Sequence, residues 1–162
     1  MLGRYGQALG PVQGVGYVNE LLARLTGSAV NDSTQTNSTL DSSPETFPLD
    51  RSFYIDFSHD NQMVAIYSAI GLFRQPSALN VTKADPARTW YASNLVPFSA
   101  RLVTERLQCN KNAYVRMFVD DALQPLKFCG SDANKMCTLQ AFVQSQNYSR
   151  SNGAGDFEKC FV

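Results

Sequence analysis

The sequence predicts a mixed α/β fold formed by one domain. Two patterns lead to this prediction. Residues 53–57 form a short aromatic and β-branched run, and a helical repeat of apolar side chains follows almost directly, from Asp60. Residues 100–126 contain two alternating stretches followed by a short return. The first pattern is half of a βα unit, and the second is an antiparallel meander.

The first helix is predicted over residues 11–25, where apolar side chains recur at helical spacing. Pro11 suits a first-turn position and Gly27 suits the stop. Gly14 and Gly16 each cost about 1 kcal/mol relative to Ala inside a helix. Their presence indicates either close packing against a neighbour or a helix that begins later, near Gly16.

Residues 26–52 differ in composition from the rest of the chain. Ser and Thr dominate them, and Pro44 and Pro48 interrupt them. We expect an exposed loop here. The loop lies inside a single domain segment that spans residues 1–162.

The next segment is predicted to be a strand that feeds directly into a helix. Residues 53–57 are apolar enough for a strand covered on both faces. The helical pattern that follows can end at Gly71, and Ser58 or Asp60 can serve as its N-cap. His59 and Asp60 then lie at the carboxyl end of a strand, where open α/β sheets bind their ligands.

The second half of the chain predicts an antiparallel meander. Strands are expected over residues 100–107 and 114–119, with a turn at residues 120–123 before a short return. A short helix is expected over residues 138–145.

The composition excludes several functions. The chain has 162 residues, with 14 Lys or Arg against 14 Asp or Glu, so its formal net charge is zero. A general polyanion binder needs a basic surface, so no nucleic-acid partner is expected. No apolar run is long enough to cross a bilayer, so no membrane partner is expected either. The only histidine is His59, so this chain cannot supply two imidazoles to one site.

The cysteines are either buried thiols or disulfides, because none has the spacing of a zinc site or a CxxC pair. Four Asn-x-Ser/Thr sequons lie in polar, turn-rich stretches, and they favour a secreted glycoprotein with disulfides. The cysteines are Cys109, Cys129, Cys137 and Cys160, and the sequon asparagines are Asn31, Asn37, Asn80 and Asn147.

Residues 1–10 contain no apolar stretch of the kind that a signal peptide needs. The sequons and cysteines are typical of a protein from an oxidising compartment, which normally needs a targeting segment. Their combination with a start that lacks such a segment indicates a fragment. We therefore expect the front of the protein to be absent and this chain to be a C-terminal segment.

Three chemistries compete at residues 58–61. A Ser-His-Asp relay is excluded because consecutive side chains on an extended strand point to opposite faces. A metal site is excluded because one His and one Asp cannot fill it, so no metal or other cofactor is expected. The third is a general-acid site, in which Asp60 gives a proton to a leaving group while His59 and the helix N-terminus hold an anion such as phosphate.

A structural role is the alternative at the same position. His59 would then be a hydrogen-bonded core histidine and Asp60 a helix cap. A helix start also stabilises an ionised carboxylate, which opposes its use as an acid, whereas a bound phosphate dianion favours the protonated form. The acid role therefore requires bound substrate and an acidic medium.

One resemblance covers essentially the whole chain. It rests on residues 10–25 (GPVQGVGYVNELLARL), residues 40–49 (LDSSPETFPL) and residues 57–61 (FSHDN), together with the cysteines. In this order the blocks resemble the C-terminal portion of the secreted fungal phytases in the histidine acid phosphatase family.

The resemblance implies an incomplete part of a histidine-phosphatase-like α/β domain. It also implies hydrolysis of phosphomonoesters such as phytate (myo-inositol hexakisphosphate) at acidic pH without a metal. In the family, a histidine within an Arg-His-Gly-x-Arg-x-Pro motif attacks phosphorus and forms a phosphohistidine. By position, Asp60 is the general acid that protonates the leaving alcohol, His59 contacts the phosphate, and Asn61 adjoins the substrate.

The sequence departs from the family at the nucleophile. The Arg-His-Gly-x-Arg-x-Pro motif is absent, so the chain carries the acid but not the attacking histidine. We expect an active parent phosphomonoesterase and an inactive isolated chain. The resemblance also implies a Cys129–Cys137 disulfide, with Cys109 and Cys160 pairing to upstream cysteines that this chain lacks. The alternative function is a secreted, non-catalytic glycoprotein module that has lost its activity.

Overall fold

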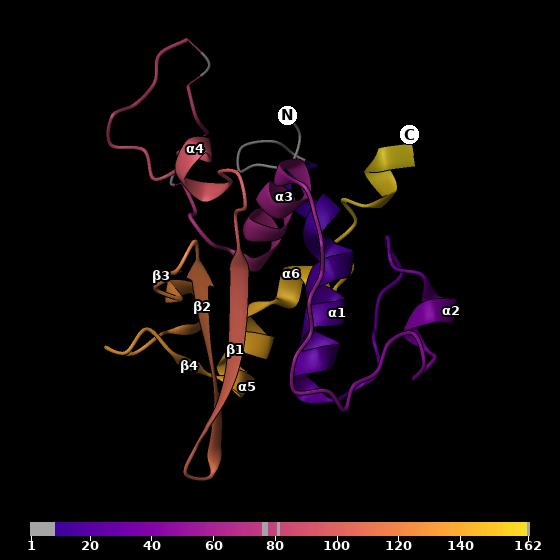
Figure 1. Ribbon diagram of the computed structural model, residues 1–162. Helices are drawn as coiled ribbons and strands as arrows, with labels where there is room; N and C mark the ends of the chain where they lie inside the picture. Colours follow the sequence, from indigo (N-terminus) through magenta and orange to yellow (C-terminus); the bar gives the residue numbers. More distant parts are fainter. Residues whose placement is uncertain (1–8, 76–77, 81, 162) are drawn as a thin grey trace.

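A computed structural model describes residues 9–75, 78–80 and 82–161. Most of the segment on which the absence of a signal peptide was predicted, residues 1–8, lies outside the described residues. Figure 1 shows helices α1, α3 and α5 on one side of the sheet, with the loop that carries α2 beyond α1. The α-helices are α1 (Val15–Thr26), α2 (Ser38–Asp41), α3 (Asp60–Ile70), α4 (Ala92–Leu95), α5 (Leu139–Ser145) and α6 (Asn147–Arg150); the 3-10 helices are η1 (Pro11–Gly14), η2 (Lys127–Cys129) and η3 (Glu158–Phe161); the strands are β1 (Leu102–Cys109), β2 (Asn112–Val119), β3 (Ala122–Leu123) and β4 (Cys137–Thr138).

The first helical segment confirms the prediction and settles the role of Gly14. The chain begins as the 3-10 helix η1 and continues as α1, which ends where Gly27 adopts a left-handed φ of 70°. A Cβ added at Gly14 would lie 2.5 Å from the carbonyl oxygen of Ala65 on α3. Gly14 is therefore required by close helix packing, and the α-helix also begins later than Pro11.

The antiparallel meander is confirmed, with β2 at its centre. β1 pairs with β2 from Leu102↔Val119 to Cys109↔Asn112, and both β3 and β4 pair with the other edge of β2. Alternate side chains of β2 are buried against the helices, as the period of a strand requires. These buried side chains are Val115, Met117 and Val119.

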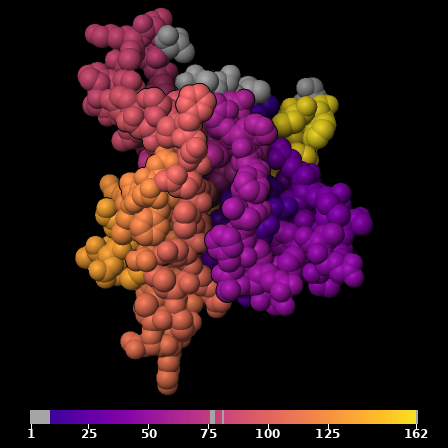
Figure 2. All heavy atoms as spheres, viewed as in Figure 1, coloured from indigo at the N-terminus to yellow at the C-terminus, as the bar shows by residue number. Residues whose placement is uncertain are grey.

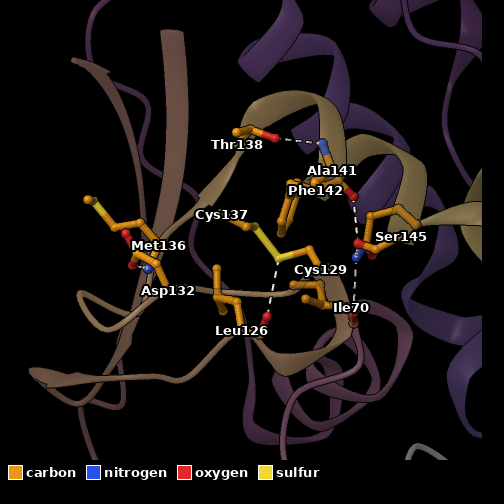
Figure 3. The surroundings of a disulfide bond; sticks show 11 residues. Ile70, Leu126, Cys129, Asp132, Met136, Cys137, Thr138, Ala141, Phe142 and Ser145 are labelled. Carbon is orange, nitrogen blue, oxygen red and sulfur yellow. Dashed lines mark hydrogen bonds between the residues drawn. A yellow bond between two sulfur atoms is a disulfide. The ribbon is translucent and has the colours of Figure 1, made fainter. Parts of the chain in front are cut away.

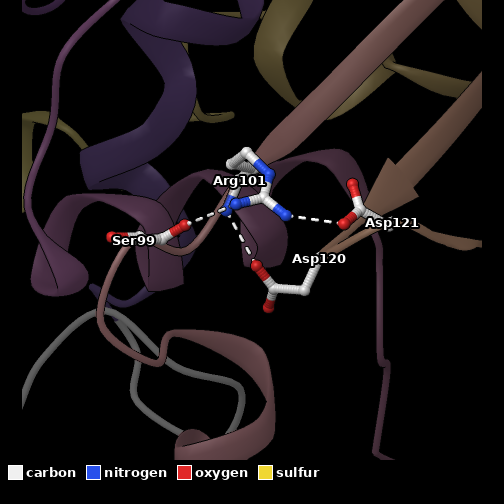
Figure 4. A network of polar contacts seen from close by, with 4 residues as sticks. All are labelled: Ser99, Arg101, Asp120 and Asp121. Carbon is white, nitrogen blue, oxygen red and sulfur yellow. Dashed lines mark hydrogen bonds and ion pairs between the residues drawn. The ribbon is translucent and has the colours of Figure 1, made fainter.

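A polar network holds the turn between β2 and β3 (Figure 4). Asp120 and Asp121 have positive φ angles of 48° and 65°, which Asp tolerates better than most residues. The backbone N–H of Arg101 donates to Asp120 at 2.8 Å, and its guanidinium donates to Asp121 at 2.6 Å and to the Ser99 carbonyl at 3.3 Å. Because the ion pair is exposed, it fixes the turn geometry more than it adds stability.

The predicted disulfide between Cys129 and Cys137 is confirmed (Figure 3). It joins η2 to β4 across 8 positions of sequence, with Cα atoms 6.0 Å apart. Beside it, the Thr138 hydroxyl accepts a hydrogen bond from the Ala141 N–H and caps α5. The other two cysteines, Cys109 and Cys160, are free and exposed, and their predicted pairing to other cysteines stays a prediction.

The prediction of a buried strand at residues 53–57 is wrong. The segment runs to α3 without regular structure, and Phe53, Ile55 and Phe57 are 76%, 64% and 92% exposed. A strand forms only when a neighbour satisfies its backbone groups. Among the described residues, no strand lies beside this segment.

The preceding segment, residues 26–52, is mostly exposed, as predicted. It contains the short helix α2 and one buried aromatic side chain, Phe47.

Within the described parts of the chain, no helix is both long and apolar enough to cross a membrane.

Candidate functional site

Helix α3 forms a rigid base for the candidate site. Every residue from 64 to 70 is buried. Gly14 of η1 packs closely on Ala65, and the Tyr67 hydroxyl donates a 3.2 Å hydrogen bond to the Leu95 carbonyl. The helix is thus fixed along its length, while its N-terminal end reaches the surface.

His59 holds the N-cap position of this helix, so the prediction of Ser58 or Asp60 as the cap is wrong. The His59 backbone is extended, with φ −123° and ψ 161°, and its side chain makes no capping hydrogen bond. Asp60 is already the first helical residue. Its carboxylate accepts a 2.7 Å hydrogen bond from the Asn61 N–H, which keeps the carboxylate at the helix start.

The three predicted site residues, His59, Asp60 and Asn61, lie on the surface of the structure. Ser58, His59, Asp60 and Asn61 are all exposed, so the alternative of His59 as a core histidine is wrong. The first N–H groups of a helix lack intrahelical acceptors and carry partial positive charge. An exposed imidazole and an exposed carboxylate therefore lie at the positively polarised start of a helix, where they can hold an anion and exchange a proton with it.

Metal ligands are not clustered at this point. Among the residues that the structure describes, no group of three or more His, Cys, Asp or Glu side chains is placed to hold a metal ion. What the arrangement offers is acid–base chemistry beside an anion.

Sequence reasoning missed the residue that holds the segment leading to the site. Arg24 of α1 donates to both carboxylate oxygens of Asp56, at 2.5 and 3.2 Å. Its guanidinium also stacks on the rings of Phe47 and Tyr54, at 4.8 and 5.0 Å. In Figure 2 the held segment, in magenta, lies at the surface between the β1–β2 hairpin and the α2 region. The available signal was a basic residue in the last turn of a helix whose other side packs in the core.

A group of carboxylates surrounds this arginine. The pKa of Glu20 is raised to about 7 from its ordinary 4.5, first by burial and then by the Asp41 carboxylate, while Arg24 opposes the shift. One carboxylate oxygen of Asp41 is buried without a hydrogen-bond partner. The folded chain therefore favours the protonated form of Glu20 more than the unfolded chain does.

Replacing Glu20 by Gln is expected to stabilise the chain above pH 7 and to leave it unchanged below pH 4.5. Between these values the unfolded carboxyl releases its proton first, so the wild type loses stability as the pH rises through the window. Because Glu20 is only half-buried, solvent screening reduces the effect of its pKa shift on stability. We therefore expect the free energy of unfolding to rise by about 1–2 kcal/mol in the Gln variant. Urea unfolding at both ends of the window measures this difference. Glu45→Gln on the exposed loop is the matched control, and an equal gain from both variants would contradict the burial argument.

Comparison with known proteins identifies the family. The family model described as Histidine phosphatase superfamily (branch 2) matches residues 2–120. The chain belongs to this superfamily.

Among its relatives are two fungal proteins named Phytase A. The chain is 46% identical over 161 residues to Phytase A of Emericella nidulans and 44% identical over 170 residues to Phytase A of Aspergillus fumigatus. These alignments cover 97% and 99% of this chain but 34% and 36% of the relatives. The chain thus spans about a third of the length of the relatives it matches.

A solved structure shares the fold. The crystal structure of the phytase from D. castellii matches with a TM-score of 0.71 at 22% sequence identity. The match covers 96% of this chain and 30% of that chain. At this identity the match establishes the fold, and the predicted histidine-phosphatase-like architecture is confirmed.

Proposed function

We propose that this chain carries the proton-donating part of a phosphomonoesterase centre that hydrolyses phytate and related phosphate esters. Asp60 protonates the leaving alcohol, His59 contacts the phosphate, and Asn61 adjoins the substrate. The observation that carries the proposal is the exposed carboxylate of Asp60 at the start of a rigid helix, directly beside the only imidazole of the chain. The names of the relatives support the choice of phytate.

The reaction divides between this chain and a nucleophile that lies outside it. An attacking histidine forms a bond from nitrogen to phosphorus as the ester bond from phosphorus to oxygen breaks. The carboxyl proton of Asp60 passes to the departing alkoxide oxygen, so a neutral alcohol leaves. Water then hydrolyses the phosphohistidine and releases phosphate. His59 is the only histidine in the sequence, so the isolated chain is expected to be inactive.

Secretion and glycosylation belong to the same proposal. All four sequon asparagines, Asn31, Asn37, Asn80 and Asn147, are exposed. The Thr82 hydroxyl donates a 2.8 Å hydrogen bond to the Asn80 side-chain oxygen, which links the first and third residues of this sequon. Exposed sequons and a disulfide support a protein of an oxidising compartment.

A chimera tests the proposal directly. The matched region of Emericella nidulans Phytase A is replaced by this chain, and hydrolysis of phytate is followed as phosphate release in mildly acidic buffer. We expect a folded chimera that releases phosphate. A folded chimera without activity would favour the second candidate, a secreted module that keeps the fold and has lost its catalytic activity. The absence of a nucleophilic histidine motif from this chain supports that candidate.

A further inference from the structure

Glu20 lies on α1 where the loop that carries α2 packs against the helix (Figure 1). It precedes Arg24 by one helical turn, so the two side chains share one face of α1. The ionisable groups that face Glu20 come from four segments of the chain: Tyr17 and Arg24 from α1, Asp32 from the loop after it, Asp41 from α2 and Asp56 from the segment before α3.

Three of these groups are already accounted for. The carboxylate of Asp32 accepts hydrogen bonds from side-chain and backbone donors around it, and the carboxylate of Asp56 accepts two from Arg24. Burial raises the pKa of Tyr17 to about 12, so its hydroxyl stays neutral wherever a carboxyl group titrates. The arrangement therefore leaves Asp41 and Arg24 as the neighbours of Glu20 with unused hydrogen-bonding capacity.

Two buried polar atoms beside Glu20 are unsatisfied within the described residues. Oδ2 of Asp41 is an acceptor without a donor, and Nε of Arg24 is a donor without an acceptor. Burying such atoms without partners is costly. An ionised carboxylate can only accept hydrogen bonds, whereas a protonated carboxyl group donates through its O–H and accepts through its C=O oxygen. Protonated Glu20 is therefore the form that can serve both atoms.

We infer that Glu20, Asp41 and Arg24 form a pH-sensitive latch between α1 and the loop that carries α2. In the closed state the Glu20 O–H donates to Oδ2 of Asp41, and the Glu20 C=O oxygen accepts from the Nε–H of Arg24. As the pH rises, the carboxyl proton passes to water. Ionised Glu20 still accepts from Arg24, but it repels the Asp41 carboxylate, so the latch opens at α2.

The direction of the pH dependence follows from the raised pKa of Glu20, about 7 in the folded chain against an ordinary 4.5. The contribution of the latch is complete below pH 4.5 and is lost as the pH rises through about 7. The latch is thus closed in the acidic medium that the proposed hydrolysis requires. The inference goes beyond that proposed function, and its test needs no phosphatase activity.

Hydrogen exchange of the α2 amides in the full chain tests the latch. The N–H groups of Leu40 and Asp41 both donate to the Asn37 carbonyl at 2.9 Å, so their protection reports whether α2 is held in place. Exchange is measured at about pH 5 and about pH 8, each rate divided by that of an unfolded peptide at the same pH. We expect protection in α2 to fall about tenfold at the higher pH, the equivalent of one pKa unit, and protection in β2 to stay constant.

Two variants and a control separate the latch from other pH effects. Glu20→Gln mimics the protonated acid, because its amide donates to Asp41 and accepts from Arg24 at every pH, so the fall should disappear. Asp41→Asn removes the repulsion, so the fall should disappear here too. In this variant Glu20 should titrate at a lower pH than in the wild type, measured by carbon-13 NMR of its carboxyl group. Glu45→Gln, on the exposed part of the same loop, should keep the fall of the wild type.

Three results would overturn the inference. The first is protection of α2 in the wild type that does not change with pH. The second is a fall of the same size in Glu20→Gln, because another group would then control the loop. The third is an unchanged titration of Glu20 in Asp41→Asn, because the two carboxyl groups would then not be coupled.

Discussion

Replacing Asp60 by Asn in the chimera should slow the hydrolysis of alkyl phosphates about 10²–10⁴-fold, the range typical of losing a positioned general acid. The amide keeps the size and the hydrogen bond to the Asn61 N–H, but it has no acidic proton to give. Inositol phosphates release an alkoxide, which is a poor leaving group until it is protonated. The loss should therefore appear in kcat for phytate, measured as initial rates of phosphate release.

The leaving group provides the internal control for this prediction. A nitrophenyl phosphate releases an acidic phenol that departs without protonation, so its hydrolysis should be much less affected by Asp60→Asn. Asp50→Asn, in the exposed loop before the site, is the matched variant and should leave both substrates unaffected. Equal losses on both substrates would show that Asp60 acts through structure or binding and would contradict its role as the acid.

Elements with local signals could be predicted from the sequence. Apolar spacing and a stop glycine define α1 and α3, and in both helices the glycine adopts the left-handed conformation that ends the helix. Alternating apolar side chains predict β1 and β2. The short connection between these two strands, which are neighbours in sequence, then sets their register. These signals need no information about distant parts of the chain.

The environment of residues 53–57 could not be predicted in the same way. Their composition describes a strand buried on both faces, but burial requires neighbours, and the sequence of the segment does not say which chain provides them. The structure leaves the apolar side chains exposed. The composition therefore correctly predicted that these side chains are apolar and strand-like, but it wrongly predicted that they are buried in this chain.

The same limit applies to the candidate site. The proximity of His59, Asp60 and Asn61 follows from their adjacency in sequence, but their exposure does not. The contact of Arg24 with Asp56 joins residues 32 positions apart, and no periodic pattern specifies such a pair. Long-range polar contacts decide how the site is held, and they became visible only with the fold.

Replacing Gly14 by Ala is expected to destabilise the chain by about 1–3 kcal/mol, the cost of overpacking a close contact. Gly14 has φ −102° and ψ −4°, which any residue can adopt, so the effect is steric rather than conformational. The new Cβ would lie 2.5 Å from the Ala65 oxygen and 2.9 Å from the Ala69 Cβ, and η1 must move away from α3 to admit it. Urea unfolding monitored by circular dichroism measures the loss.

Gly16→Ala is the matched control for the packing argument. A Cβ at Gly16 would meet the end of the Thr36 side chain at 3.1 Å, in a loop that can yield, rather than the backbone of a helix. Ala also has the better helix propensity by about 1 kcal/mol, which offsets this contact. We expect a net change for Gly16→Ala well below that for Gly14→Ala. If the two variants were equally destabilised, close packing of η1 on α3 would not be the reason for glycine at position 14. The argument that this packing holds α3, and with it Asp60, in place would then fail as well.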